Sequence, residues 1–198
     1  MRQLALKISP PPQPTLDNFV PGANAELLAR LREFQENRIQ ETILYLWGDA
    51  GSGKSHLLGA CAGPNVVDDV EKLDDASQIA LFNTINDARQ TGGKVLAAGN
   101  APPRLLPLRD DLKSRLAWGL VYHVKSLTDD ERASYLRAES GRRGMRVPDE
   151  VISYLLTHVR RDLPTLVSIL DELDRMSLEL KRPVTLPLVR EALKEMEE

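Results

Sequence analysis

The stretch Gly48-Asp49-Ala50-Gly51-Ser52-Gly53-Lys54-Ser55 decides the fold of this chain. The apolar, β-branched and aromatic run at 42–47 is typical of a buried strand, and residues 56–62 are typical of the first turns of a helix. A glycine-rich loop between a strand and a helix is the context of a phosphate-binding loop. The glycines let the backbone turn its N–H groups toward an anion, and the helix N-terminus adds partial positive charge. We therefore predict a nucleotide site here, the alternative being a chance Gly/Ser loop.

Two side chains of this loop have a chemical role in such a site. Lys54 is expected to reach the β- and γ-phosphates, and the Ser55 hydroxyl to ligate Mg²⁺. A short strand is expected at 65–70, and its C-terminal end carries a carboxylate pair, Asp68 and Asp69. There Asp68 would hold the Mg²⁺ shell together with Ser55, and Asp69 would polarise the attacking water. The predicted ligand is ADP or ATP with Mg²⁺; the alternative for the acidic pair is a solvated turn.

The composition is that of an ordinary globular protein, with 198 residues, 42% apolar and 28% charged. The formal net charge of −3 argues against a general DNA binder, although Arg142-Arg143 and Arg160-Arg161 leave room for a local basic patch. The single cysteine, Cys61, excludes an internal disulfide framework. Because no apolar run approaches the ~20 residues that span a bilayer and no signal-peptide core is seen, we expect a cytoplasmic protein without a membrane partner.

Two helices are expected in the first half of the chain besides the one after the loop. One begins at Asn24, its predicted N-cap, and extends through Phe34. The other begins at Ser77 and is ended by Gly92-Gly93. Its buried face is expected to carry Ile79, Leu81, Phe82, Ile85 and Ala88.

Further strands are expected at 94–100 and 120–124, with a short helix at 111–116 between them. The first of these strands finishes on Asn100. In open α/β sheets, ligands bind beyond the carboxyl ends of the strands. Asn100 is therefore placed to face a γ-phosphate or its water; the alternative is a simple turn residue.

From Thr128 onward the pattern is helical. Thr128 with Glu131 three residues later predicts a capping box, and Gly141 and Gly144 are expected to break the first helix. The sequence thus predicts a nucleotide-binding core over 15–127 and an all-helical lid over 128–198. The expected lid helices are at 129–140, 148–159, 163–180 and from about 186.

Residues 1–14 precede the core. Prolines between Ser9 and Pro14 predict an extended, stiff spacer, because proline can join neither a helix nor a central strand. The peptide before it, Gln3-Leu4-Ala5-Leu6-Lys7-Ile8, would be held away from the body of the protein and is a candidate for recognition by another protein. The alternative is a frayed terminus.

Several segments together resemble the DnaA branch of the AAA+ ATPases, almost end to end. The segments that carry the resemblance, besides the loop, are Thr15-Leu16-Asp17-Asn18-Phe19-Val20, Tyr45-Leu46-Trp47-Gly48, Ser55-His56-Leu57-Leu58, Asp68-Asp69-Val70, Asn100-Ala101-Pro102-Pro103-Arg104, Leu112-Lys113-Ser114-Arg115-Leu116-Ala117-Trp118-Gly119 and Arg161-Asp162-Leu163. The resemblance implies an α/β fold, an AAA+ P-loop core with a parallel sheet, followed by the small helical lid.

The resemblance also implies roles for individual residues. The segment at 15–20 would lie near adenine, Asn100 would be sensor 1, Arg115 the arginine finger and Arg161 sensor 2. His56, next to the loop, joins the nucleotide-binding set on the same ground, although the three histidines show no metal-ligand spacing. An arginine finger supplies its guanidinium to a nucleotide on a neighbouring subunit and stabilises charge that develops on the γ-phosphate. For either arginine the alternative is an ordinary surface residue.

The sequence departs from this branch in two places. Only twelve residues separate Ser55 from Asp68, where the family has a helix, an edge strand and another helix. A parallel crossover alone takes about a dozen residues. We therefore expect a shortened core whose edge strand is missing, with four parallel strands left and a Mg²⁺ site whose geometry is open. Asp69 stands where many active ATPases have the longer Glu, so we expect slow or absent hydrolysis by the isolated protein.

These observations favour a nucleotide-controlled regulator of the DnaA initiator. The peptide Gln3–Ile8 is similar to the clamp-binding peptide of regulators in this branch, which implies docking on the DNA polymerase III sliding clamp (its beta subunit) and contact with DNA only through the clamp. Arg115 would engage ATP-bound DnaA and stimulate its hydrolysis. No basic recognition helix follows Leu186, which favours a regulator over an initiator. The alternatives are a self-sufficient ATPase, such as a helicase loader or DNA-remodelling factor, and a nucleotide-free scaffold; homo-oligomerisation through the arginine-finger edge is left open.

Overall fold

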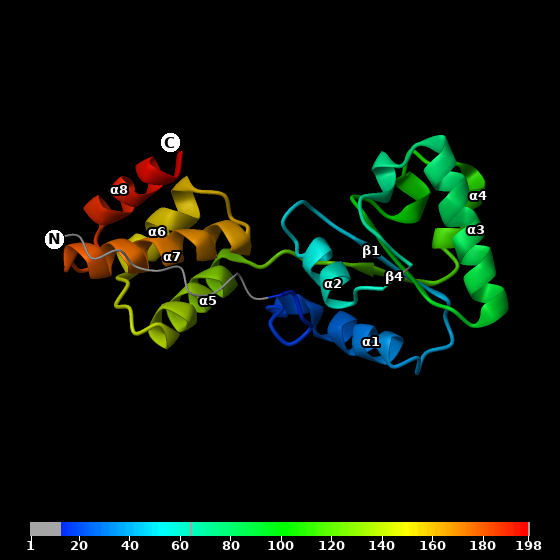
Figure 1. Ribbon diagram of the computed structural model, residues 1–198, viewed down its shortest axis with the longest axis horizontal. Coiled ribbons are helices and arrows are strands. Elements are labelled where there is room, and N and C mark those ends of the chain that lie inside the picture. The colour runs from blue at the N-terminus through cyan, green and yellow to red at the C-terminus, as the bar shows by residue number, and fades with distance from the viewer. Residues whose placement is uncertain (1–12, 64, 198) are drawn as a thin grey trace. The chain divides into compact units, whose positions relative to one another are not determined.

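The computed structural model describes residues 13–63 and 65–197 and divides into two compact units. The first runs from Gln13 to Ser126 and contains the sheet; the second begins at Leu127 and is helical (Figure 1). The peptide Gln3–Ile8 lies outside the described residues, so its role stays a prediction.

A sheet of four parallel strands forms the centre of the first unit, in the order β2-β3-β1-β4. Ile43 pairs with Val95 across β1 and β3, and Leu44 pairs with Leu120 across β1 and β4. The strands are β1 (Ile43–Trp47), β2 (Val66–Val67), β3 (Val95–Gly99) and β4 (Leu120–His123). The strand that leads into the glycine-rich loop is therefore inside the sheet, where neighbours on both sides hold it.

Helices cover both faces of this sheet, and the alternation of side chains along β1 decides which residues each face buries. Leu44 and Leu46 pack with α1 (Ala25–Gln35) and α2 (Lys54–Ala60). Ile43 and Tyr45 point to the opposite face and pack with the other two helices. Those helices are α3 (Asp75–Thr91) and α4 (Asp110–Leu116). The result is a three-layer α/β core.

The expectation of an AAA+ sheet with four parallel strands is confirmed. The core is short between the loop and the carboxylate pair. The helix α2 has only seven residues, and β2 has two. The run predicted from Asn65 to Val70 leaves the sheet early because Asp69 takes a left-handed conformation, φ 48°, and a 3-10 turn follows at Val70–Lys72. No further strand pairs with the outer edge of β2 among the described residues.

Asn24 precedes α1 as predicted, but its side chain does not cap the helix. The amide is buried, 3% exposed, and bonds to residues far along the chain instead. Its Nδ2 donates to the carbonyls of Pro21 and Lys125, and its Oδ1 accepts the Lys125 N–H. Asn24 therefore fastens the start of α1 to the segment that follows β4.

The helix α3 also differs from the prediction. It begins at Asp75 with Asp74 as N-cap, and the Asp74 carboxylate accepts the Ser77 N–H. Ile79 is not buried but 45% exposed, and Phe82 is half-buried. Ile79 therefore lies on the solvent side of α3, whereas Leu81, Ile85 and Ala88 face the core.

The second unit has a core of its own, in which leucine, isoleucine and valine side chains of its four helices pack together. The predicted capping box is present, because Thr128 and Glu131 bond reciprocally. Gly141 lies inside the first helix, contrary to expectation; the break comes at Gly144, whose φ is 72°. The helices are α5 (Asp129–Arg142), α6 (Asp149–His158), α7 (Leu163–Leu180) and α8 (Leu186–Glu197). Within the described residues, no helix has the length and apolar character needed to cross a membrane.

We predict that Asn24→Ala destabilises the core. The substitution leaves the Lys125 N–H and carbonyl without their side-chain partner, which costs about 1–3 kcal/mol. Urea unfolding followed by circular dichroism measures the loss. Gln90→Ala, on the exposed face of α3, is the control and is expected to change the free energy of unfolding by less than about 0.5 kcal/mol. Equal midpoints for the two variants would contradict the assignment.

Candidate nucleotide-binding site

The glycine-rich loop connects the end of β1 to the first residue of α2, Lys54. The Lys54 ammonium donates to the carbonyls of Gly48 and Asp49, at 2.8 and 2.9 Å, so it is held against the first residues of the loop. The Ser52 hydroxyl is buried and has no partner among the described residues. A loop that carries one fixed cation and a helix N-terminus is suited to an anion such as a polyphosphate.

Gly53 is one of the positions in this loop where a side chain would be strained. Its φ is 99°, in the left-handed region, and a Cβ there would lie 2.6 Å from Cε2 of Phe19. Phe19 also packs against His56, with ring centroids 5.6 Å apart. His56 Nε2 lies 3.0 Å from the Thr15 carbonyl, and because a carbonyl only accepts, this nitrogen is the protonated one. The segment at 15–20 thus closes over the start of α2.

The shortened connection brings Ser55 and Asp68 into direct contact. The Ser55 hydroxyl donates to Asp68 Oδ2 at 2.6 Å, and the other carboxylate oxygen, Oδ1, accepts the Asp69 N–H at 2.9 Å. Mg²⁺ in nucleotide sites takes one or two protein oxygens and completes its shell with phosphate and water. Among the described residues no cluster of three or more metal-ligating side chains occurs. The hydroxyl–carboxylate pair fits Mg²⁺ held jointly with a nucleotide.

Asp69 points to a different partner. Its carboxylate pairs with Lys72 Nζ at 2.6 Å, across the 3-10 turn. The hydrogen bond to Asp69 raises the pKa of Lys72, so the ammonium stays charged at neutral pH. A carboxylate engaged with a lysine is a weaker acceptor for a water proton. The role of Asp69 in polarising water stays a prediction.

Asn100 follows β3 at the same edge of the sheet, and its N–H donates to Glu71 Oε2 at 3.3 Å. Burial and, secondly, the charge of Glu71 raise the pKa of Tyr45, whose hydroxyl donates to the Ala101 carbonyl. Glu71 therefore orients the backbone beside the candidate sensor residue.

The sequence analysis missed Glu71 and did not include Phe19 among the site residues. The signals that could have found them were an acidic residue two positions after Asp69 and an aromatic residue in the segment at 15–20.

The two candidate arginines have opposite environments. Arg115, on α4, has its guanidinium carbon 3.8 Å from the centroid of the Trp118 ring and no ion pair among the described residues. Arg161 lies in the second unit, before α7 rather than at its start, and its Nη1 is 3.2 Å from Asp129 Oδ2. Asp129 also pairs with Arg132 at 2.9 Å. The structure thus groups the loop, His56 and Asp68 in one site, whereas Arg115 belongs to the opposite face of the sheet.

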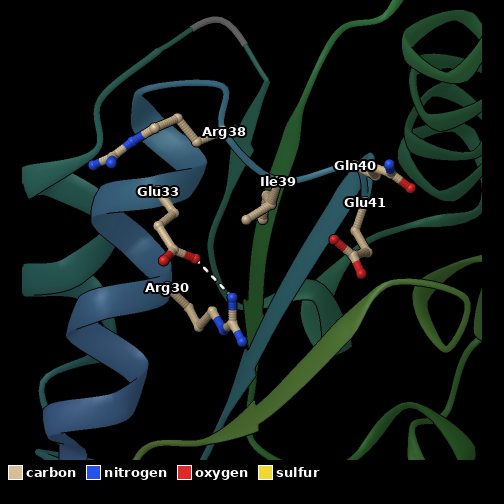
Figure 2. Close-up of a pocket in the computed structure, with 6 residues that line it drawn as sticks. All are labelled: Arg30, Glu33, Arg38, Ile39, Gln40 and Glu41. Carbon is tan, nitrogen blue, oxygen red and sulfur yellow. Dashed lines mark hydrogen bonds and ion pairs between the residues drawn. The ribbon is translucent and has the colours of Figure 1, made fainter.

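A hollow elsewhere in the first unit is not part of this site. Figure 2 shows the six residues that line it. Two of them, Arg30 and Glu33, form an exposed ion pair in which the nitrogen and oxygen are 2.7 Å apart. The six residues come from the C-terminal part of α1 and from the segment that leads into the N-terminal end of β1. The glycine-rich loop follows the opposite, C-terminal end of β1. The polar, open lining offers no element of nucleotide chemistry. Its residues are Arg30, Glu33, Arg38, Ile39, Gln40 and Glu41.

Comparison with known proteins finds a family model that matches the second unit and solved structures that share the fold of the chain. Residues 129–193 match the family model of the Hda lid domain. Domain III of the replication initiation protein DnaA from Thermotoga maritima superposes with a TM-score of 0.75 at 21% identity, over 93% of this chain and 98% of that one. The second unit therefore carries a lid domain of the Hda type, and the chain has the fold of DnaA domain III.

Two other structures show that the fold is shared more widely. AMPPCP-bound DnaA from Aquifex aeolicus gives a TM-score of 0.66 at 21% identity, over 79% of this chain and 64% of that chain. A RuvB variant from Thermotoga maritima gives 0.66 at 17% identity, over 92% of this chain and 72% of that chain. At such identities the likeness shows the AAA+ fold and no more. The family assignment of the lid comes from the match at 129–193.

Proposed function

We propose that this Hda-like protein is a nucleotide-bound adaptor that switches off the DnaA initiator and so negatively regulates the initiation of DNA replication. Its core binds ADP or ATP with Mg²⁺ through the loop, Ser55 and Asp68. Its N-terminal peptide docks on the sliding clamp of DNA polymerase III. Arg115 acts on ATP held by DnaA, which then hydrolyses its own nucleotide.

The observation that carries the proposal is the joining of an Hda-type lid to a DnaA-type core. Two contacts and one unpaired side chain in the core support its chemistry. Lys54 is held in the loop, Ser55 bonds to Asp68, and Arg115 has no carboxylate partner among the described residues. A DnaA structure with AMPPCP shows that this fold accommodates an adenine nucleotide in a relative. The Asp69–Lys72 pair argues against a self-sufficient ATPase.

Calorimetric titration with Mg-ADP tests the nucleotide site. We expect binding by the natural chain and a loss of roughly 10- to 100-fold in affinity for Gly53→Ala, because alanine strains a left-handed residue that touches Phe19. Gly63→Ala is the matched control, since a Cβ there has ample space and no positive φ. If the natural chain binds neither ADP nor ATP, the core is a scaffold and the proposal is wrong.

Arg115→Ala tests the action on DnaA. An arginine that stabilises phosphoryl-transfer charge contributes about 10³-fold or more, so stimulated hydrolysis of DnaA-bound ATP is expected to fall by that factor. Released phosphate under single-turnover conditions gives the rate. Arg146→Ala, an exposed arginine in the second unit, should leave it unchanged. Full stimulation by the Arg115 variant would refute the assignment, and turnover without DnaA would favour the self-sufficient ATPase.

A clamp pull-down tests the N-terminal peptide. We expect the double substitution Gln3→Ala, Leu4→Ala to abolish retention on the immobilised beta clamp while Mg-ADP binding stays normal. The reason is that the peptide and the nucleotide core are separate binding elements. Gln13→Ala, at the end of the spacer, is the control and should be retained like the natural chain. Undiminished retention of the double variant would remove the clamp from the proposal.

A further inference from the structure

The indole of Trp118 lies on the surface directly after α4, and more than half of it, 53%, is exposed. Gly119 fixes its position, because a Cβ at Gly119 would lie 2.1 Å from the Ile43 carbonyl oxygen. The turn therefore runs close against the start of β1, and the indole is held on a rigid part of the core.

Two arginines lie over this ring. The guanidinium carbon of Arg115 is 3.8 Å from the ring centroid, and that of Arg89, from α3, is 5.0 Å away. The Arg115 guanidinium also lies over the half-buried ring of Phe82, at 5.1 Å. Arg115 Nε is buried without a hydrogen-bond partner. The rings of Phe82 and Trp118 thus both contact the guanidinium of Arg115.

This manner of holding an arginine differs from an ion pair in its consequence. Aromatic rings attract a guanidinium through their quadrupole and restrict its rotamers, yet they leave its charge uncompensated. A carboxylate would compete with an incoming phosphate for the same N–H groups. Within the described residues neither Arg115 nor Arg89 has a carboxylate partner, whereas Arg161 is paired with Asp129. The arrangement suits an arginine that meets an anion supplied from outside.

We infer that Trp118 is a positioning residue for Arg115. With Phe82 it holds the guanidinium in a fixed, partly desolvated orientation, so that the arginine meets the phosphate of a partner's nucleotide without first losing rotamer freedom. Arg89 adds positive charge beside the same ring. This inference rests on the proposed function, since it concerns the same arginine.

Stimulated single-turnover hydrolysis on ATP-bound DnaA tests the inference. We expect Trp118→Leu, which keeps an apolar side chain but removes the aromatic face, to lower the maximal stimulated rate roughly 3- to 30-fold. The protein concentration at half-stimulation should change less than the rate. Trp118→Phe should recover most of the rate. Leu178→Ala, an exposed apolar residue on α7, is the matched control and should behave as the natural chain.

Combination with Arg115→Ala shows whether the two residues act together. If Trp118 acts only through Arg115, the double variant Trp118→Leu, Arg115→Ala is no slower than Arg115→Ala alone. Additive losses, or a natural rate for Trp118→Leu, would overturn the inference while leaving the proposed function intact. If the natural chain gives no stimulation at all, the proposed function fails, and the positioning role fails with it.

Fluorescence tests the stacking without DnaA. The chain has two tryptophans, so Trp47→Phe leaves Trp118 as the only indole. In this background Arg115→Ala should raise the acrylamide quenching constant of Trp118, because the guanidinium no longer covers the ring. Arg89→Ala should raise it less, since that guanidinium lies farther away. An unchanged constant after loss of Arg115 would show that the ring does not hold the arginine.

Discussion

The hydrogen bond from the Ser55 hydroxyl to the Asp68 carboxylate is the contact on which the candidate site depends. It joins the first turn of α2 to the residue that follows β2, with only twelve residues between Ser55 and Asp68. These twelve residues hold the rest of α2, a turn and the two residues of β2, and leave no room for a further helix and strand. The core therefore loses a strand at its edge and keeps the pair of oxygens that would hold Mg²⁺.

The order of the strands also positions the candidate site. The strand β1 is flanked by β3 and β4, so the loop that follows it starts from a fixed point. The other candidate residues are held by contacts with different consequences. Asp69 is tied to Lys72 and Arg161 to Asp129, whereas Arg115 rests on aromatic rings. Ion pairs satisfy a charge in place, and aromatic stacking leaves it available. This difference is the basis for the proposal that Arg115 acts on a partner's nucleotide.

Local patterns were enough to predict many elements. The strand, loop and helix around Gly48–Ser55, the capping box at Thr128 and the bounds of α7 are as expected, because each depends on residues within a few positions of one another. The predictions that were wrong depend on distant partners. Asn24 has the residue type of a helix cap, yet its amide bonds to Lys125, and Ile79 was assigned to the buried face of its helix but is exposed in the packed core.

The sequence by itself determined the phosphate-binding loop, the division into a strand-containing core and a helical segment, and the resemblance that named the candidate arginines. These features are encoded in spacing and residue type, which folding does not alter. Only the tertiary structure decided that Ser55 meets Asp68, that Asp69 turns to Lys72, and that Phe19 closes over Gly53. It also decided that Arg115 is held by Phe82 and Trp118, since α3 and α4 come side by side only when both pack on the same face of the sheet.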